Sequence, residues 1–206
     1  MRAAGLLAVL AATSAPLSAQ VSVQFSAGAR YSGALVHDAI VTDFDVRPAL
    51  APVLAFALQL PPHRGWAAGV AFDLSRGQLR RYDADASTRD LGVLGALSFM
   101  VTLRRELPAD LGARVTLGGV HYLPPRDTNM FGPGEIGIFR GDNEAWRPLI
   151  GLAIDWQPPP ARARGLALEL RTDVHRFLTP VLRNEGFTAH RLVPRVTLAL
   201  RAAMAR

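Results

Sequence analysis

The sequence predicts an all-β fold, an eight-stranded antiparallel up-and-down transmembrane β-barrel preceded by a cleaved signal peptide. Three observations predict it. The first residues have the pattern of an export signal, eight later segments alternate apolar with polar or small residues, and the seven connections between them alternate in length. Together they indicate one exported domain whose strands each have an apolar face and a polar face.

The N-terminus has the three parts of a secretory signal peptide. Met1 and Arg2 supply the positive start, residues 3–12 are apolar, and Ala19 is the small residue that a signal peptidase needs. The apolar stretch is too short to span a bilayer as a helix. The alternative is an apolar N-terminal helix of a cytosolic protein, against which Pro16 argues. We expect residues 1–19 to be the signal peptide and residues 20–206 to form the barrel domain.

Composition excludes several classes of protein. The 206 residues include no cysteine, so disulfides and thiolate metal sites are not available. The formal net charge is +6, but the 23 basic residues, all arginine, are dispersed, and no basic run indicates nucleic-acid binding. After the signal peptide, no stretch approaches the roughly 18 to 20 apolar residues of a membrane-spanning helix. The protein is therefore either soluble after export or spans a membrane with strands.

Eight segments show the alternation of a strand with two different faces. They are residues 21–31, 46–60, 66–76, 91–104, 111–122, 146–157, 166–176 and 192–201. Proline cannot donate a hydrogen bond to a strand ladder, and four prolines fall in these segments: Pro48, Pro52, Pro148 and Pro194. Three of them lie close to a segment start, which suits a rim or a bulge. Pro52 lies deeper and leaves the start of the second strand open.

The connections alternate strictly in length. The long ones are residues 32–45, 77–90, 123–145 and 177–191, and the short ones are 61–65, 105–110 and 158–165. Transmembrane barrels have this pattern, with tight periplasmic turns at one end and extracellular loops at the other. A soluble periplasmic lipocalin-like carrier of apolar ligands would explain the alternating faces equally well. A soluble carrier has no reason to place its short loops at one end of the barrel and its long loops at the other. The loop lengths therefore favour the membrane barrel.

Ten charged residues share the face opposite the apolar one. They are Arg30, Asp73, Arg104, Arg114, Asp155, Glu169, Arg171, Asp173, Arg195 and Arg201. An eight-stranded barrel is just wide enough for side chains to fill, and buried charges must be paired. We expect these residues to form an ionic network that plugs the lumen. A narrow polar pore is the alternative.

Aromatic residues fall near the predicted ends of the strands. They are Tyr31, Trp66, Tyr122, Trp146, Trp156 and Phe177. Rings of this kind form a girdle at each membrane interface of a transmembrane barrel. We therefore expect these six side chains to form an aromatic girdle.

At this point the chain resembles the small eight-stranded outer-membrane barrels of Gram-negative bacteria, the class that contains the barrel of outer-membrane protein A and the X and W types. The resemblance covers residues 20–206 and is architectural. It implies a monomer in the outer membrane with a structural, adhesive or surface-interaction role. The implied partners are outer-membrane lipid, lipopolysaccharide and the barrel assembly machinery. Many members end in an aromatic residue that this machinery reads, whereas this chain ends Met204-Ala205-Arg206.

The sequence gives no catalytic, metal or cofactor site. Lipid-modifying barrels need a serine with histidine and carboxylate near the membrane face, whereas Glu169, Asp173 and His175 are predicted to face inward. The five histidines are dispersed, and Asp83 with Asp85 is only a fragment of a calcium loop. We expect no enzyme activity.

The long connections are the natural place for recognition. The third connection carries Arg80, Arg81 and Arg89, which have the chemistry to bridge lipopolysaccharide phosphates. The simpler expectation is that these charges are solvated.

Overall fold

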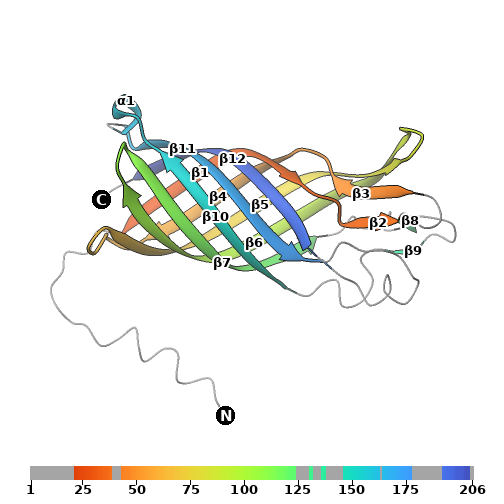
Figure 1. Ribbon diagram of the computed structural model, residues 1–206, viewed down its shortest axis with the longest axis horizontal. Coiled ribbons are helices and arrows are strands. Elements are labelled where there is room, and N and C mark those ends of the chain that lie inside the picture. The colour runs from red at the N-terminus through yellow and green to blue at the C-terminus, as the bar shows by residue number, and fades with distance from the viewer. Residues whose placement is uncertain are drawn as a thin grey trace, which may run out of the picture.

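The computed structural model describes residues 21–38, 43–123, 130–131, 136–137, 146–162, 164–177 and 192–204. The predicted signal peptide, residues 1–19, lies outside them. The predicted loops 123–145 and 177–191 lie mostly outside them. The described residues form an antiparallel barrel, with a hairpin that extends beyond one end (Figure 1).

Eight strands form the closed ring, as the alternation predicts. They are β1 (Ser22–Ser32), β4 (Ala51–Gln59), β5 (Trp66–Asp83), β6 (Thr88–Leu107), β7 (Leu111–Leu123), β10 (Arg147–Trp156), β11 (Leu166–Arg176) and β12 (Leu192–Met204). Each pairs antiparallel with the strand before and after it, and β1 pairs with β12 to close the ring. The prediction of an eight-stranded up-and-down barrel is therefore confirmed.

The short connections gather at one end of the barrel, here called the turn end. They are residues 60–65 between β4 and β5, 108–110 between β6 and β7, and the segment with α1 (Pro159–Arg162) between β10 and β11. Gly165 closes the last of these turns with a φ of +67°. Its carbonyl accepts the Ala203 N–H at 2.7 Å, and a Cβ at Gly165 would press on the Ala203 carbonyl oxygen. Glycine is needed there because it tolerates both constraints.

The opposite end, here called the hairpin end, carries more strand than the sequence predicts. The prediction that residues 77–90 form a loop is wrong, because β5 continues to Asp83 and β6 begins at Thr88. Period-2 alternation weakens in this stretch, and a bulge between Gln78 and Arg80 shifts the register. At the tip, the side chain and the backbone N–H of Ser87 donate to Asp85 and lower the pKa of its carboxyl.

The first long connection also contains strands. β2 (Val36–Asp38) pairs with β3 (Phe44–Pro48), and β3 pairs with the distal half of β5. The predicted loop 32–45 is therefore only partly loop. Two further short strands, β8 (Met130–Phe131) and β9 (Ile136–Gly137), pair with each other at the same end (Figure 1).

The prolines are accommodated within the strands. Pro48 ends β3, and β4 begins at Ala51, so the second predicted segment divides into two strands there. Pro194 lies in β12, where its carbonyl accepts the N–H of Gly33 at 2.8 Å, just beyond the end of β1. Its missing N–H thus faces the end of a neighbouring strand, where a ladder bond is least needed.

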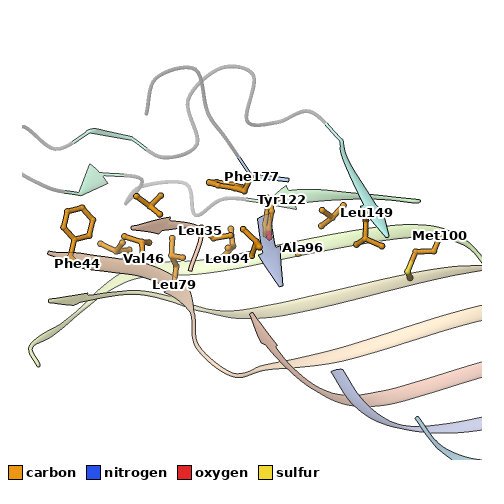
Figure 2. Packing of buried hydrophobic residues seen from close by; sticks show 14 of the residues in the cluster. Leu35, Phe44, Val46, Leu79, Leu94, Ala96, Met100, Tyr122, Leu149 and Phe177 are labelled. Atoms are coloured by element: carbon orange, nitrogen blue, oxygen red, sulfur yellow. The ribbon is translucent and has the colours of Figure 1, made fainter. Parts of the chain in front are cut away.

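An apolar cluster fills the interior at the hairpin end (Figure 2). Its larger members are Leu35, Val36, Phe44, Val46, Leu79, Leu91, Leu94, Met100, Val120, Tyr122, Leu149, Phe177 and Val193. Two of these, Tyr122 and Phe177, are predicted above for the aromatic girdle. That prediction is wrong for both, because they are 3% and 0% exposed. Their rings pack edge to face, with centroids 5.7 Å apart.

Candidate functional site

The ten charged residues predicted for the lumen all lie inside the barrel wall, buried except for Arg104, which is partly exposed. Ion pairs sort them into two groups of five. The central group is Arg30, Asp73, Arg171, Asp173 and Arg195. The turn-side group is Arg104, Arg114, Asp155, Glu169 and Arg201.

The central group crosses the lumen from one side of the wall to the other. Arg30 on β1 donates from Nη1 and Nη2 to the two oxygens of Asp73 on β5, both at 2.9 Å. Arg171 on β11 donates to the same carboxylate at 2.5 Å. Arg195 on β12 binds Asp173 at 2.5 Å, and Arg171 lies 3.4 Å from Asp173. Two aspartates are thus shared among three arginines.

Hydroxyl groups accept hydrogen bonds from further donors of the central group. Arg30 Nε donates to Thr197 Oγ1 at 3.0 Å, and Arg30 Nη1 lies 3.3 Å from Ser75 Oγ. Arg195 Nη2 donates to Ser98 Oγ at 3.2 Å. These hydroxyls are absent from the predicted set of site residues, although strand alternation places them on the inward face. The alternation of side chains along each strand predicts that these hydroxyls face inward. Which arginine each one contacts depends on which strands face each other across the lumen.

The turn-side group is built around one aspartate. Asp155 on β10 accepts hydrogen bonds from Arg104 and Arg201, both at 2.8 Å. Arg114 on β7 binds Glu169 at 3.2 Å, and Arg201 lies 3.6 Å from the same glutamate. Since these carboxylates have two or more arginine neighbours, no buried carboxylate of this group lacks a partner among the described residues.

The inward histidine does not form a catalytic arrangement with its neighbours. His175 Nε2 lies 2.8 Å from Tyr122 Oη, whereas Glu169 binds Arg114 and Asp173 binds Arg195. The three residues named from the sequence therefore have three separate sets of partners. Within the described chain, no group of three histidine or acidic residues has the arrangement of a metal site.

The interior has open space on both sides of the ionic network. A vestibule of about 350 Å³ opens at the turn end, with Gln24, Gln59, Ala67, Arg104 and Gln157 among its lining residues. A second cavity, of about 10 Å³, lies between the central group and the apolar cluster. The two groups of ion pairs lie in the barrel between these spaces.

The outer face of the ring is apolar. Among the large side chains exposed on it are Phe25, Leu54, Phe72, Phe99, Leu117, Leu152, Leu170 and Leu198. Tyr31 and Trp146 lie exposed toward the hairpin end, and Trp66 and Trp156 lie exposed at the turn end. A lipocalin-like carrier would place its apolar face inside and its charges in water. The barrel has the reverse arrangement, so that alternative is wrong.

No helix in the described part of the chain is long and apolar enough to cross a membrane. No protein-family model and no curated protein matches the sequence. Among solved structures, the outer membrane protein AlkL is similar, with a TM-score of 0.53 at 13% identity over 95% of each chain. The chain has the fold of the small outer-membrane β-barrels. The apolar belt and this fold together place the barrel in the outer membrane.

Two other outer-membrane barrels are similar in outline. The outer membrane protein Ail of Yersinia pestis has a TM-score of 0.49 at 10% identity, covering 90% of this chain and 99% of that one. The outer membrane protein OprG of Pseudomonas aeruginosa has a TM-score of 0.46 at 8% identity, covering 91% and 98%. By the general rule that short turns of outer-membrane barrels face the periplasm, the hairpin end would be extracellular.

Arginines on and beside the β5–β6 hairpin have defined partners. Arg80 binds Asp90 at 2.8 Å, and this hydrogen bond raises the pKa of the guanidinium. Arg81 binds Asp83 and stacks over the ring of Phe44 at 4.1 Å. Arg47, on β3 directly opposite Arg80, stacks over the ring of Tyr82 at 4.4 Å. Of the three arginines singled out from the sequence, two are thus already ion-paired.

Proposed function

We propose that this outer-membrane barrel is a closed protein with a structural, adhesive or surface-interaction role, and that its ionic network plugs the lumen. The observation that carries the proposal is the set of ion pairs between six arginines and four carboxylates on facing parts of the wall. Buried pairs with several partners hold their geometry, because breaking one leaves an uncompensated charge. The apolar cluster at the extracellular end supports the same conclusion, since it gives ions no favourable path.

The test is ion flux through the purified, refolded barrel. We expect liposomes that contain the protein to retain small ions as protein-free liposomes do, and planar bilayers to show no conductance steps. Insertion is checked independently by the shift in gel mobility on heating that folded barrels show. Steady single-channel steps from correctly inserted protein would refute the plug and establish the narrow pore.

Lipopolysaccharide is the partner that the extracellular chemistry favours. Arg47 and Arg80 are direct neighbours on β3 and β5, and like charges placed opposite each other repel. Asp90 neutralises Arg80, whereas the described contacts of Arg47 are the Tyr82 ring and the Tyr31 hydroxyl, 3.3 Å away. A phosphate of the lipid would neutralise Arg47, and arginine suits this because its planar fork binds phosphate with two donors.

Binding of lipopolysaccharide with and without its phosphates tests this partner. We expect Arg47→Gln to weaken binding of the phosphorylated lipid and to leave binding of the dephosphorylated lipid unchanged. Arg64→Gln, in a periplasmic turn, is the matched control and should change neither. Equal weakening by both variants would mean that general charge attraction, and no site at Arg47, is responsible.

We further propose that the protein acts without catalysis and as a monomer. The separate partners of Glu169, Asp173 and His175 support the first point. The closed ring supports the second, because it leaves none of its eight strands with a free edge across the membrane. The barrel assembly machinery is a further proposed partner, with β12 as the strand that closes the ring.

A further inference from the structure

The buried charges of the central group do not balance. Arg30, Arg171 and Arg195 supply three positive charges, and Asp73 with Asp173 supplies two negative ones. All five side chains are at most 4% exposed. A buried charge without compensation is very costly, so one further negative charge would stabilise this part of the barrel.

Two of the three arginines have a buried nitrogen without a hydrogen-bond partner among the described residues: Arg171 Nε, which lies 3.4 Å from Asp173 Oδ2, and Arg195 Nη1. Arg195 is 1% exposed, and its Nε and Nη2 donate to Asp173 and Ser98. Its Nη1 is buried and has no hydrogen-bond partner among the described residues. The large majority of buried polar side-chain atoms in proteins have a hydrogen-bond partner, so an acceptor beside this nitrogen would be favourable.

A cavity lies beside that side chain. It is lined by Arg195 and Arg30, by the hydroxyl residues Ser32, Ser75 and Tyr122, and by the small or apolar Pro48, Ala51, Gly77, Leu94 and Ala96. Among the described residues, its polar lining is two arginines and three hydroxyl groups, with no carboxylate. At about 10 Å³ it has room for the centre of one water or one small ion and excludes sulfate or an organic anion.

The buried surroundings of His175 favour one of its tautomers. His175 Nδ1 is buried without a partner among the described residues, and an unpaired N–H costs more there than an unpaired lone pair. The tautomer protonated at Nε2 is therefore favoured, and it donates to Tyr122 Oη. Tyr122, whose side chain lines the cavity, thus accepts a hydrogen bond from His175.

We propose that this cavity binds a single small monovalent anion, chloride in the cell, between Arg195, Arg30 and the hydroxyl groups around them. The anion supplies the negative charge that the central group lacks and the acceptor that Arg195 Nη1 lacks. It also separates the ionic network from the apolar cluster above it. The site is independent of whether the lumen conducts and of any extracellular partner.

Bromide is the probe, because it replaces chloride and scatters X-rays anomalously. Crystals of the refolded barrel are grown in sodium bromide, and anomalous difference maps are recorded above and below the bromine edge. We expect one buried peak in contact with Arg195 Nη1 and Arg30, which persists when bromide is reduced to the millimolar range. An ordered water in its place, with no anomalous signal, would overturn the proposal.

A second measurement follows stability in solution. The barrel is unfolded with urea in detergent, in chloride or in gluconate at equal ionic strength. An anion that binds only the folded state raises the folded-to-unfolded ratio about elevenfold at ten times its dissociation constant. We expect this gain with chloride and bromide and none with gluconate. Equal stability in all three salts would contradict the site.

Two variants locate the effect. Arg195→Lys keeps the charge but removes Nη1, and we expect it to abolish the chloride gain. Arg201→Lys is the matched control, because Arg201 belongs to the turn-side group and does not line the cavity. If Arg195→Lys does not fold, Ser75→Val fills the cavity with carbon and should have the same effect. A chloride gain that survives in whichever of these variants folds would refute the location.

Discussion

Arg30 and Asp73 form a two-pronged ion pair that passes over β4, because their own strands, β1 and β5, each pair with β4 on opposite sides. The inward residues of β4 between them are small: Ala51, Val53, Ala55 and Ala57. Their size leaves room for an arginine side chain to lie across the strand. This pair ties three strands of the wall together from inside.

Removing the aspartate of this pair should destabilise the barrel strongly. Asp73→Asn leaves Arg30 and Arg171 without their shared counter-charge, and breaking a buried pair in this way costs about 3–5 kcal/mol. Urea unfolding in detergent, followed by gel mobility, measures it. Asp90→Asn is the control, because its pair with Arg80 is exposed and should matter little. Similar losses of unfolding free energy in the two variants would show that the buried Asp73 pair stabilises the barrel no more than the exposed pair does.

The orientation of the barrel can be tested by labelling, because the natural chain has no cysteine and therefore no background. We expect Ala84→Cys, at the tip of the β5–β6 hairpin, to react with a membrane-impermeant maleimide on intact cells. Pro108→Cys, in the turn between β6 and β7, should react only after the outer membrane is opened. Both positions are exposed in the folded barrel. Labelling of Pro108→Cys on intact cells would reverse the proposed orientation.

The rim aromatics and the buried ones should differ in contact with lipid. Trp66, Trp146 and Trp156 are between 41% and 53% exposed on the outer face. Their fluorescence should be quenched by phospholipids brominated near the headgroup, each in a variant that keeps one tryptophan. Phe177→Trp in a variant without the others places the probe in the apolar cluster, and we expect it to be shielded. Strong quenching of that probe would mean that Phe177 faces lipid after all.

One glycine in the wall should resist substitution. A Cβ at Gly118 would collide with the carbonyl oxygen of Phe99 on the neighbouring strand, so Gly118→Ala forces β6 and β7 apart. We expect a loss of about 1–3 kcal/mol, the usual cost of overpacking. Gly119→Ala is the neighbouring control, since its Cβ would meet the movable Trp146 ring at 3.1 Å. Thermal unfolding of the two variants side by side checks the difference, and equal midpoints would contradict it.

The ring of strands could be predicted from the sequence because alternation reports directly on which face of a strand is buried. The same rule places Tyr122 and Phe177 inward. Each is separated by an even number of positions from an inward residue, Arg114 for Tyr122 and His175 for Phe177. Their assignment to the girdle relied on their place near the strand end and overlooked the alternation of faces along the strand. When a residue's place near the strand end and the alternation of faces predict different environments, the alternation is the better guide. A side chain cannot change to the other face of the strand without a bulge.

Other features could not be predicted because they depend on contacts between distant segments. β3 becomes a strand by pairing with β5, about 35 residues further along the chain, and β5 and β6 extend because they pair with each other. The separation of the ionic network into two groups follows from the register of β5, β10 and β11 around the ring. The sequence identifies the charged residues of the interior but not which arginine meets which carboxylate.

The unequal strand lengths have a consequence for how the protein meets its surroundings. β5 has 18 residues and β11 has 11, so at about 3.3 Å per residue β5 is longer by about 23 Å. With the strands tilted by roughly 40°, the tip of the hairpin rises about 18 Å farther from the bilayer than the end of β11. In the proposed orientation, sugar chains of neighbouring lipopolysaccharide would surround an arm of that height. Among the described residues, those at its tip would then be the ones that an antibody, a bacteriophage or another cell reaches first.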